Sequence, residues 1–203
     1  TLPLVYTQHP EREGHNLGMY RLQVFGPRTT GMHWQIGKGG GFHYQAAEAR
    51  GQALPVTVLL GGPPALILSA IAPLPENVPE LMLASLVAGR RLPLARIDDW
   101  PHPLVASAEF ALMGTVAPGV RRPEGPFGDH YGYYSLRHDY PVFDVARMAH
   151  RHDAIYPATV VGKPRQEDFF IGDLLQDLLS PLFPLVMPSV LSLWSYGEAG
   201  YHS

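Results

Sequence analysis

Two carboxylates, Glu124 and Asp129, lie five residues apart in a segment that reads EGPFGD and leads into an aromatic cluster. Glycine and proline restrict this turn, and loops held between regular elements often carry catalytic side chains. Two acids in one wall of a site can differ in pKa, so that one stays ionised while the other carries a proton for general acid–base chemistry. The same residues also fit a solvated acidic turn, so the segment alone leaves both interpretations open.

An amide and a guanidinium flank a second segment, NLGMYR, which runs from Asn16 to Arg21 into a predicted strand. Alternation along the strand places Arg21 and Gln23 on one face. The guanidinium offers five donors in a fixed geometry and is suited to clamping a carboxylate. A structural ion pair is the alternative role for this arginine.

A glycine-rich run at residues 37–41 precedes His43 and a predicted helix, whose free amides could face a phosphate. The spacing is not that of a nucleotide-binding P-loop. His43 is either a metal ligand or a polar residue at the start of the helix. Glu80 follows Pro79 at another predicted helix start, where a carboxylate also complements the helix dipole. Asn16, His43 and Glu80 together would form an O/N site for a hard divalent ion such as Mn²⁺ or Mg²⁺.

Two apolar, proline-rich turns precede Glu80, at residues 61–65 and 70–75. Their backbone could line a planar cofactor at Ala72 and Pro73, or could simply make the loops rigid. The sequence lacks the G-x-S-x-G, H-E-x-x-H and strand-linked G-x-G-x-x-G motifs, which disfavours hydrolase, zinc protease and Rossmann functions.

The elements that must position these residues are mainly strands. The 21 glycines and 21 prolines punctuate short β-branched and aromatic runs. The predicted strands are 19–25, 31–36, 56–61, 110–116, 131–136, 141–150, 154–161 and 190–195, and the predicted helices are 42–50, 79–88 and 166–179. Many strands with few helices predict a mainly β, α+β fold, in which short helices wrap a barrel, rather than a doubly wound sheet.

Composition narrows the function classes. The chain has 203 residues, 46% of them hydrophobic and 16% charged, a formal net charge of −3 and no cysteine. These values disfavour nucleic-acid binding and exclude disulfides and thiolate metal sites. No apolar run reaches the roughly 18 residues of a membrane span, so a soluble, cytoplasmic protein is expected. Because the chain starts at Thr1 without Met or a signal-like segment, we expect a piece of a longer polypeptide.

The ordered motifs of the chain resemble those of the UbiD-type decarboxylases, which include 3-octaprenyl-4-hydroxybenzoate carboxy-lyase. The similarity covers essentially all 203 residues. It is carried by NLGMYR at 16–21, the glycine-rich segment before His43, residues 60–65 and 72–76, Glu80, residues 108–110 and the segment 123–134.

The resemblance implies a split β-barrel of the flavin-binding kind, forming the central domain of a longer enzyme that binds prenylated FMN with Mn²⁺ (or Mg²⁺) and K⁺. The family's catalytic network falls on Arg21, Glu124 and Asp129, although Asp129 is one methylene shorter than the glutamate of other members. The implied metal ligands are Asn16, His43 and Glu80, with Lys38 or His33 as alternatives to His43. The implied cofactor contacts are these three ligands together with Arg21, Gly41, Ala72 and Pro73.

The implied reaction is the non-oxidative decarboxylation of an aromatic or α,β-unsaturated acid, with a 4-hydroxybenzoate-type precursor of ubiquinone or menaquinone as the expected substrate. Arg21 would hold a carboxylate, Glu124 would orient Arg21, and Asp129 would protonate the product carbon. We expect a homo-oligomer at full length, and peripheral membrane association if the substrate is prenylated. The alternatives are a non-catalytic flavin-binding module and a split-barrel flavin reductase, neither of which needs this network.

Overall fold

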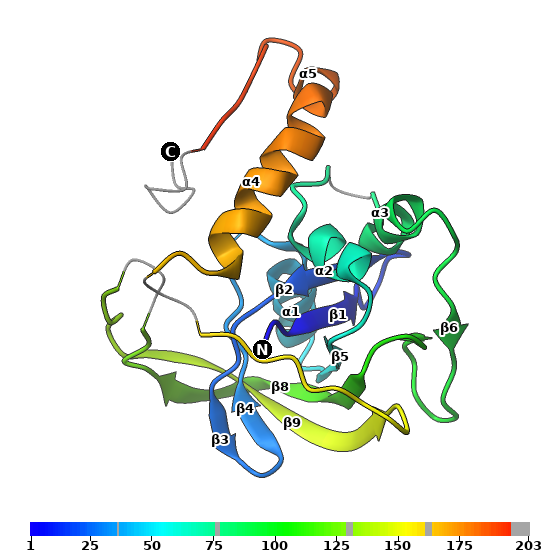
Figure 1. Cartoon of the computed structure of the whole chain (residues 1–203). Helices are drawn as coiled ribbons and strands as arrows, with labels where there is room; N and C mark the ends of the chain where they lie inside the picture. Colours follow the sequence, from blue (N-terminus) through cyan, green and yellow to red (C-terminus); the bar gives the residue numbers. More distant parts are fainter. Residues whose placement is uncertain (36, 76–77, 129–131, 161–163, 196–203) are drawn as a thin grey trace. The chain divides into compact units, whose positions relative to one another are not determined.

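The computed structural model describes residues 1–35, 37–75, 78–128, 132–160 and 164–195 (Figure 1). The chain forms two compact units. The first comprises Thr1–Gly125 and Arg137–Ala158, and the second comprises Pro126–Leu136 and Thr159–Ser203.

The first unit is built on a seven-stranded antiparallel sheet with the order β2-β1-β5-β8-β9-β4-β3. Its strands are β1 (Leu4–Gln8), β2 (His15–Met19), β3 (Val24–Gly26), β4 (Thr29–Gly31), β5 (Leu54–Leu60), β8 (Phe110–Glu124) and β9 (His138–His150). The sheet is open, because β2 and β3 are its two edges and do not pair with each other in the described part of the chain. A second, small sheet pairs β6 (Leu94–Ala95) with β7 (Leu104–Val105).

Helices of the first unit cover both faces of this sheet. Helix α1 (Gly39–Ala49) contacts β1, β2, β5 and β8, whereas α2 (Pro64–Ile71) and α3 (Glu80–Val87) contact each other and β2. Each face therefore has its own apolar core: Tyr44 and Ala47 of α1 pack in one, and Leu66 and Ala84 of α2 and α3 in the other. Burial on both faces explains why β5 reads as a nearly continuous apolar run.

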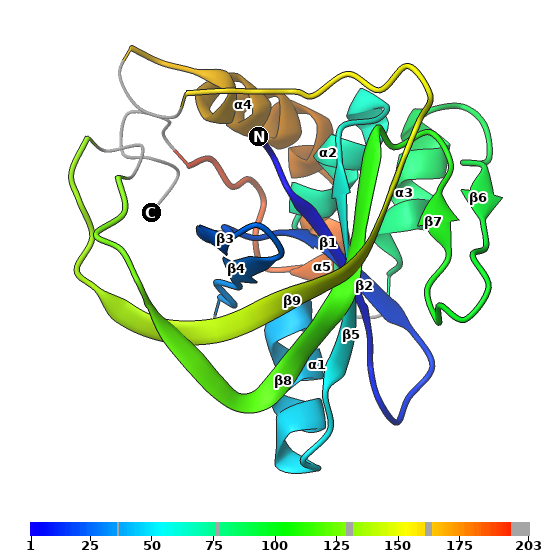
Figure 2. The same ribbon diagram turned by 90° about the horizontal axis from the view of Figure 1, so that it is seen from below.

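Strands β8 and β9 run together as a long, curved ribbon (Figure 2). Their register shifts between Met113 and Gly114, and a Cβ atom placed on Gly114 would lie 1.9 Å from the carbonyl oxygen of Asp144. Only glycine permits this close approach of the two backbones. The ribbon ends at Glu124, so the curvature of β8 sets the position of this carboxylate.

The second unit contains α4 (Glu167–Leu179), a 3₁₀ turn η1 (Ser180–Leu182) and α5 (Phe183–Val186). In its first segment, Gly128 and Tyr134 form an isolated bridge, and the Ser135 amide donates to the Phe127 carbonyl at 2.8 Å. No helix in the described ranges combines the length and apolarity required to cross a membrane.

The predicted fold class, mainly β with flanking helices, is confirmed, and the sheet is an open one. The expected helices correspond to α1, α3 and α4, and the expected strands at 56–61, 110–116 and 141–150 correspond to β5, β8 and β9. The strands predicted at 154–161 and 190–195 are wrong for their described residues. The strand predicted at 131–136 is also wrong where it is described, because only the bridge residue Tyr134 pairs there.

The predicted strands 19–25 and 31–36 were misplaced. Strand β2 ends at Met19, β3 begins at Val24 and β4 ends at Gly31. Neither β1 nor α2 was predicted from the sequence. The α2 segment looked like a rigid proline turn, but Pro64 stands in its first turn, where the missing amide hydrogen costs nothing.

Candidate active site

Backbone pairing brings Arg21 and His33 to the same place. The His33 amide donates to the Arg21 carbonyl at 3.0 Å, and the Gly31 amide donates to the Gln23 carbonyl at 2.7 Å. The connection from β2 to β3 therefore lies alongside the segment that follows β4. Opposed residues on paired extended segments share a face, so the Arg21 and His33 side chains meet.

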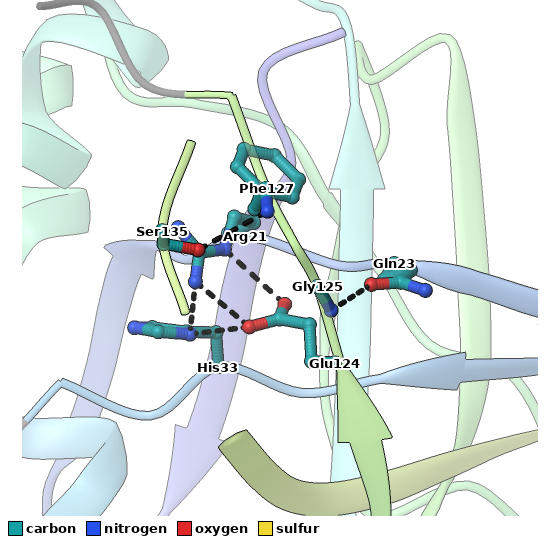
Figure 3. Close-up of polar contacts among 7 residues, drawn as sticks. All are labelled: Arg21, Gln23, His33, Glu124, Gly125, Phe127 and Ser135. Carbon is teal, nitrogen blue, oxygen red and sulfur yellow. Dashed lines mark hydrogen bonds and ion pairs between the residues drawn. The ribbon is translucent and has the colours of Figure 1, made fainter. Parts of the chain in front are cut away.

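The Glu124 carboxylate reaches both residues from the far end of β8. Arg21 Nε donates to Glu124 Oε1 at 3.2 Å, and Arg21 Nη2 donates to Oε2 at 2.7 Å (Figure 3). The Glu124 side chain is only 1% exposed. This two-point contact fixes the carboxylate against the guanidinium, which suits a charged pair held away from water.

His33 is the third member of this cluster. Its Nδ1 lies 2.8 Å from Glu124 Oε2 and 2.7 Å from Arg21 Nη2. The ring also packs, tilted by 31°, against that of Tyr140 of β9 at a centroid distance of 4.0 Å. From the sequence, His33 was considered only as an alternative metal ligand. The pairing of residues 21–23 with 31–33 was the signal that would have placed it beside Arg21.

The cluster shifts the pKa values of its members. Burial alone would raise the pKa of Glu124, but the hydrogen bonds from Arg21 and His33 outweigh it, so the pKa lies below the ordinary value. Burial lowers the pKa of His33; the Glu124 hydrogen bond opposes this shift and the Arg21 charge adds to it. Near neutral pH, an ionised Glu124 therefore lies beside a neutral imidazole.

A further hydrogen bond fixes the backbone that leaves Glu124. The Gly125 amide donates to Gln23 Oε1 at 2.7 Å, and Gly125 has a φ of +96° that favours glycine. Gln23 thus shares the face of Arg21, as alternation predicted. Asp129, the predicted proton donor, lies outside the described residues.

Most of the other predicted site residues, but not Gly41, line a large cavity in the first unit, with a volume of about 1290 Å³. Its wall contains Asn16, Lys38, His43, Ala72, Pro73 and Glu80. Arg21, His33 and Glu124 are not part of this wall, but Tyr20 and Gln35 are. The structure therefore gathers the predicted residues into two groups, which are joined by the segments 20–21 and 33–35.

At one side of the cavity, Asn16 and Glu80 lie around Tyr20 and the start of α1. The Leu17 amide donates to Glu80 Oε2 at 3.0 Å. The Tyr20 hydroxyl accepts hydrogen bonds from the Gly40 amide at 3.0 Å and from Asn16 Nδ2 at 3.4 Å. Burial raises the pKa of Glu80, while its hydrogen bonds from backbone amides act in the opposite direction.

His43 lies elsewhere in the same wall. Its Nδ1 is 2.8 Å from the buried Thr7 hydroxyl, and its ring meets that of His9 edge-on at 5.5 Å. Burial, assisted by the charges of His9 and His15, lowers the pKa of His43 to about 4. His43 is therefore neutral near pH 7, the state in which imidazole binds metals.

The polar groups that line the cavity fit an anionic cofactor better than they fit a metal ion bound by this chain alone. The described residues include no group of three or more His, Cys, Asp or Glu residues placed to hold a metal ion. A cation here would thus depend on the Asn16 amide oxygen as well as on His43 and Glu80. For an anion, the Lys38 side chain lines the cavity and the buried Nε2 of His15, also in the wall, has no partner in the described chain.

The glycines at the start of α1 explain part of the glycine-rich pattern. A Cβ atom on Gly39 would lie 2.3 Å from Asn16 Oδ1, and one on Gly40 would lie 2.7 Å from the Trp34 ring. These two glycines allow the helix to start against the cavity wall. A Cβ atom on Gly41 would lie 3.0 Å from the Gln35 carbonyl oxygen, and Gly41 does not line the cavity.

Residues 1–164 match the family of the 3-octaprenyl-4-hydroxybenzoate carboxy-lyase Rift-related domain, UbiD. The chain belongs to the UbiD family. Over its whole length it is 61% identical to a Chlamydia pneumoniae protein described as a subunit of 4-hydroxybenzoate decarboxylase, of which it covers 35%. The chain thus spans about a third of the length of this relative.

Solved structures of UbiD-class enzymes share the fold. The evolved dimeric form of HmfF from Pelotomaculum thermopropionicum, in complex with prFMN, matches with a TM-score of 0.85 and 26% identity, over 99% of this chain and 46% of that one. The closed form of vanillic acid decarboxylase from Sedimentibacter hydroxybenzoicus matches with a TM-score of 0.86 and 27% identity, over 95% of this chain and 42% of that one.

A more distant match bears on the fold alone. A Shewanella frigidimarina protein described as a flavin reductase with a split barrel domain has a TM-score of 0.50 and 12% identity, covering 79% of this chain and 72% of that one. The UbiD family and the mainly β fold class with flanking helices are confirmed, and the sheet is open rather than a closed barrel.

Proposed function

We propose that this chain is the cofactor-binding domain, residues 1–203, of a longer UbiD-family decarboxylase that acts on an aromatic or α,β-unsaturated carboxylic acid. The observation that carries the proposal is the buried Glu124 carboxylate held at both oxygens by Arg21, next to a large cavity in a chain of this family. A 4-hydroxybenzoate-type acid is the proposed substrate class, which agrees with the name of the Chlamydia pneumoniae relative.

The cavity residues would hold the cofactor, prenylated FMN. Ala72 and Pro73 offer an apolar wall for a planar ring, and Lys38 with the start of α1 offers positive charge for its phosphate. Asn16, His43 and Glu80 would hold Mn²⁺ or Mg²⁺ there, with K⁺ nearby. When bound, the prenylated flavin would supply the electron sink that decarboxylation needs, because no side chain of this chain offers one.

The ion pair would position the reacting acid. Arg21 has its Nε and Nη2 committed to Glu124, so Glu124 fixes the orientation in which the guanidinium meets a substrate carboxylate. Once carbon dioxide has left, the product carbon needs a proton. We assign this proton transfer to Asp129, which follows Glu124 by five residues.

A decarboxylation assay on the complete polypeptide, loaded with prenylated FMN and Mn²⁺, tests the proposal. Release of carbon dioxide would be measured with 4-hydroxybenzoate, vanillate and benzoate as substrates and with plain FMN as the control cofactor. We expect turnover of a hydroxylated acid only with the prenylated cofactor. Flavin reduction by a nicotinamide without decarboxylation would instead identify a flavin reductase, and binding without either reaction would identify a non-catalytic flavin module.

A further inference from the structure

His33 closes a triangle of nearly equal contacts with the ion pair. Arg21 Nη2 lies 2.7 Å from Glu124 Oε2 and 2.7 Å from His33 Nδ1, and His33 Nδ1 lies 2.8 Å from Glu124 Oε2. The guanidinium can only donate hydrogen bonds and the ionised carboxylate can only accept them. The imidazole nitrogen is the one corner whose role depends on its proton.

A proton at His33 Nδ1 therefore decides whether this nitrogen forms a hydrogen bond with Arg21 or with Glu124. Without it, Nδ1 accepts a hydrogen bond from Arg21, and its lone pair faces Glu124. With it, Nδ1 donates to Glu124 Oε2, which then accepts two hydrogen bonds, and the contact with Arg21 loses its hydrogen bond. Each state contains two hydrogen bonds and one contact without a hydrogen bond.

We propose that His33 is a positioning residue of the site: its Nδ1 holds Arg21 in one tautomer and Glu124 in the other, and so sets how firmly each is fixed. The proposal rests on the proposed function. In Figure 3 the other ring nitrogen points away from both partners, so a change of tautomer also changes what Nε2 presents on that side. A bound ligand that donates a hydrogen bond to Nε2 would favour the state in which Nδ1 holds Glu124.

The surroundings keep the ring in place while its proton moves. The Tyr140 ring packs against the imidazole at a centroid distance of 4.0 Å, and the His33 amide donates to the Arg21 carbonyl. Among the described residues, the titratable and charged groups around His33 are Arg21 from the β2–β3 connection, Glu124 from β8, and His138 and Tyr140 from β9. A positive charge on His138 would disfavour protonation of His33, whereas Glu124 favours it.

The first test measures the tautomer directly, by solid-state ¹⁵N NMR of the complete polypeptide labelled with ¹⁵N-histidine. The His33→Asn variant identifies the His33 signals by their loss. We expect Glu124→Gln to shift His33 toward bare Nδ1, because the carboxylate that accepts from Nδ1 is gone. We expect Arg21→Met to shift it toward protonated Nδ1. The same Nδ1 protonation in both variants would overturn the proposal.

The second test separates positioning from packing. An asparagine amide reaches the place of Nδ1, whereas a glutamine amide reaches that of Nε2. We expect His33→Asn to keep kcat within about threefold, and His33→Gln to lose roughly 10- to 100-fold in kcat with KM changed less than about threefold, the usual scale for residues that orient a functional group. Equal, wild-type rates for both variants would contradict the proposal.

Failure of the proposed function would look different. If the complete polypeptide decarboxylates no acid with either cofactor, the proposed reaction is wrong, but the opposite NMR shifts of the two variants still show whether His33 links Arg21 to Glu124.

Discussion

Glu124 shows how a single carboxylate can be ionised, buried and still stable. Its side chain is 1% exposed, and an ionised carboxylate without partners would be strongly disfavoured there. Two hydrogen bonds from Arg21 supply donors that water would otherwise provide, and His33 Nδ1, 2.8 Å from Oε2, supplies a third when it carries a proton. The ion pair with Arg21 therefore requires the negative charge of Glu124 and not only its shape.

We therefore expect Glu124→Gln to lower kcat of the complete, cofactor-loaded enzyme by at least about 100-fold. A loss of this size is typical when a group that takes part in acid–base catalysis is removed. The glutamine side chain has one acceptor oxygen in place of two. Its NH₂ group would therefore lie near Arg21 or His33, where the second carboxylate oxygen was. Exposed Asp98, changed to Asn, is the matched control and should leave kcat unchanged. Activity of the Gln variant within tenfold of wild type would contradict the assignment.

His102 gives a stability prediction that is independent of the proposed function. This histidine is 2% exposed, and its Nδ1 lies 3.0 Å from the Thr57 hydroxyl, which itself accepts from Trp100 Nε1 at 2.8 Å. Burial, with a smaller effect from His43, lowers the pKa of His102 to about 4. In the unfolded chain the pKa is about 6.5.

Above pH 6.5 the His102 ring is neutral in both the folded and the unfolded state, so it does not make the free energy of unfolding depend on pH. As the pH falls toward 4, the unfolded state binds the proton first, so the free energy of unfolding decreases, by up to about 3 kcal/mol for this group. Urea unfolding at pH 7.5 and pH 5 measures this loss. His102→Asn should remove part of it, while exposed His152→Asn should not; an equal loss in both variants would rule out His102 as the cause.

At the scale of elements, the β8–β9 ribbon is the part that delivers Glu124. Gly114 permits its bend, because a Cβ atom at this position would overlap the carbonyl oxygen of Asp144. Gly26 in β3 is a matched control, since a Cβ atom there meets nothing within 4 Å. We expect Gly114→Ala to cost at least about 3 kcal/mol of unfolding free energy and Gly26→Ala less than about 1 kcal/mol.

Chemical denaturation of the two glycine variants would measure this difference. Similar stabilities for the two would show that the β8–β9 backbone can separate at Gly114 without penalty. In that case the bend would not be what fixes the end of β8.

Sequence patterns predicted the elements that have strong local signals. The continuous apolar run of β5 and the alternating runs of β8 and β9 were found, as were the helices α1, α3 and α4. The segments 154–160 and 190–195 also have strand-like composition, yet no partner strand pairs with them in the described chain. Strand formation needs a neighbour, which composition does not reveal.

The residues of the candidate site, too, were predicted where the local sequence carried a signal and missed where their position depends on a partner segment. Arg21 and Glu124 were chosen from their chemistry and from the family resemblance, and the structure brings them together. His33 was not recognised as their partner, because its place depends on a backbone pairing across 12 residues that lies outside regular strands. Asp129 and its role stay a prediction, since it lies outside the described residues.

At the scale of the whole molecule, cofactor binding tests the proposal that this chain is the cofactor-binding domain of a longer polypeptide. The cavity in the first unit contains every predicted metal ligand, so we expect the 203-residue chain alone to bind prenylated FMN, more tightly with Mn²⁺ than without it. Binding would be followed by absorbance and by Tm, with plain FMN as the control. A ligand that stabilises only the folded state raises Tm with its concentration.

The complete polypeptide is the comparison for that titration. If it binds the cofactor and the 203-residue chain does not, segments outside residues 1–203 complete the cavity. If neither binds, the assignment of Asn16, His43 and Glu80 to a cofactor–metal site is wrong.

The sheet order has a consequence for how the protein is synthesised. Arg21 and Glu124 are separated by 103 residues in the chain, and the β4–β9 pairing joins Thr29 to Asp144 across 115. Contacts this distant form slowly, and on the ribosome β8 and β9 are made after β5 and β4, the strands with which they pair. A nascent chain that stops before His150 therefore exposes unpaired strand edges, so we expect its folding to begin only after translation has passed β9 and to need protection from aggregation until then.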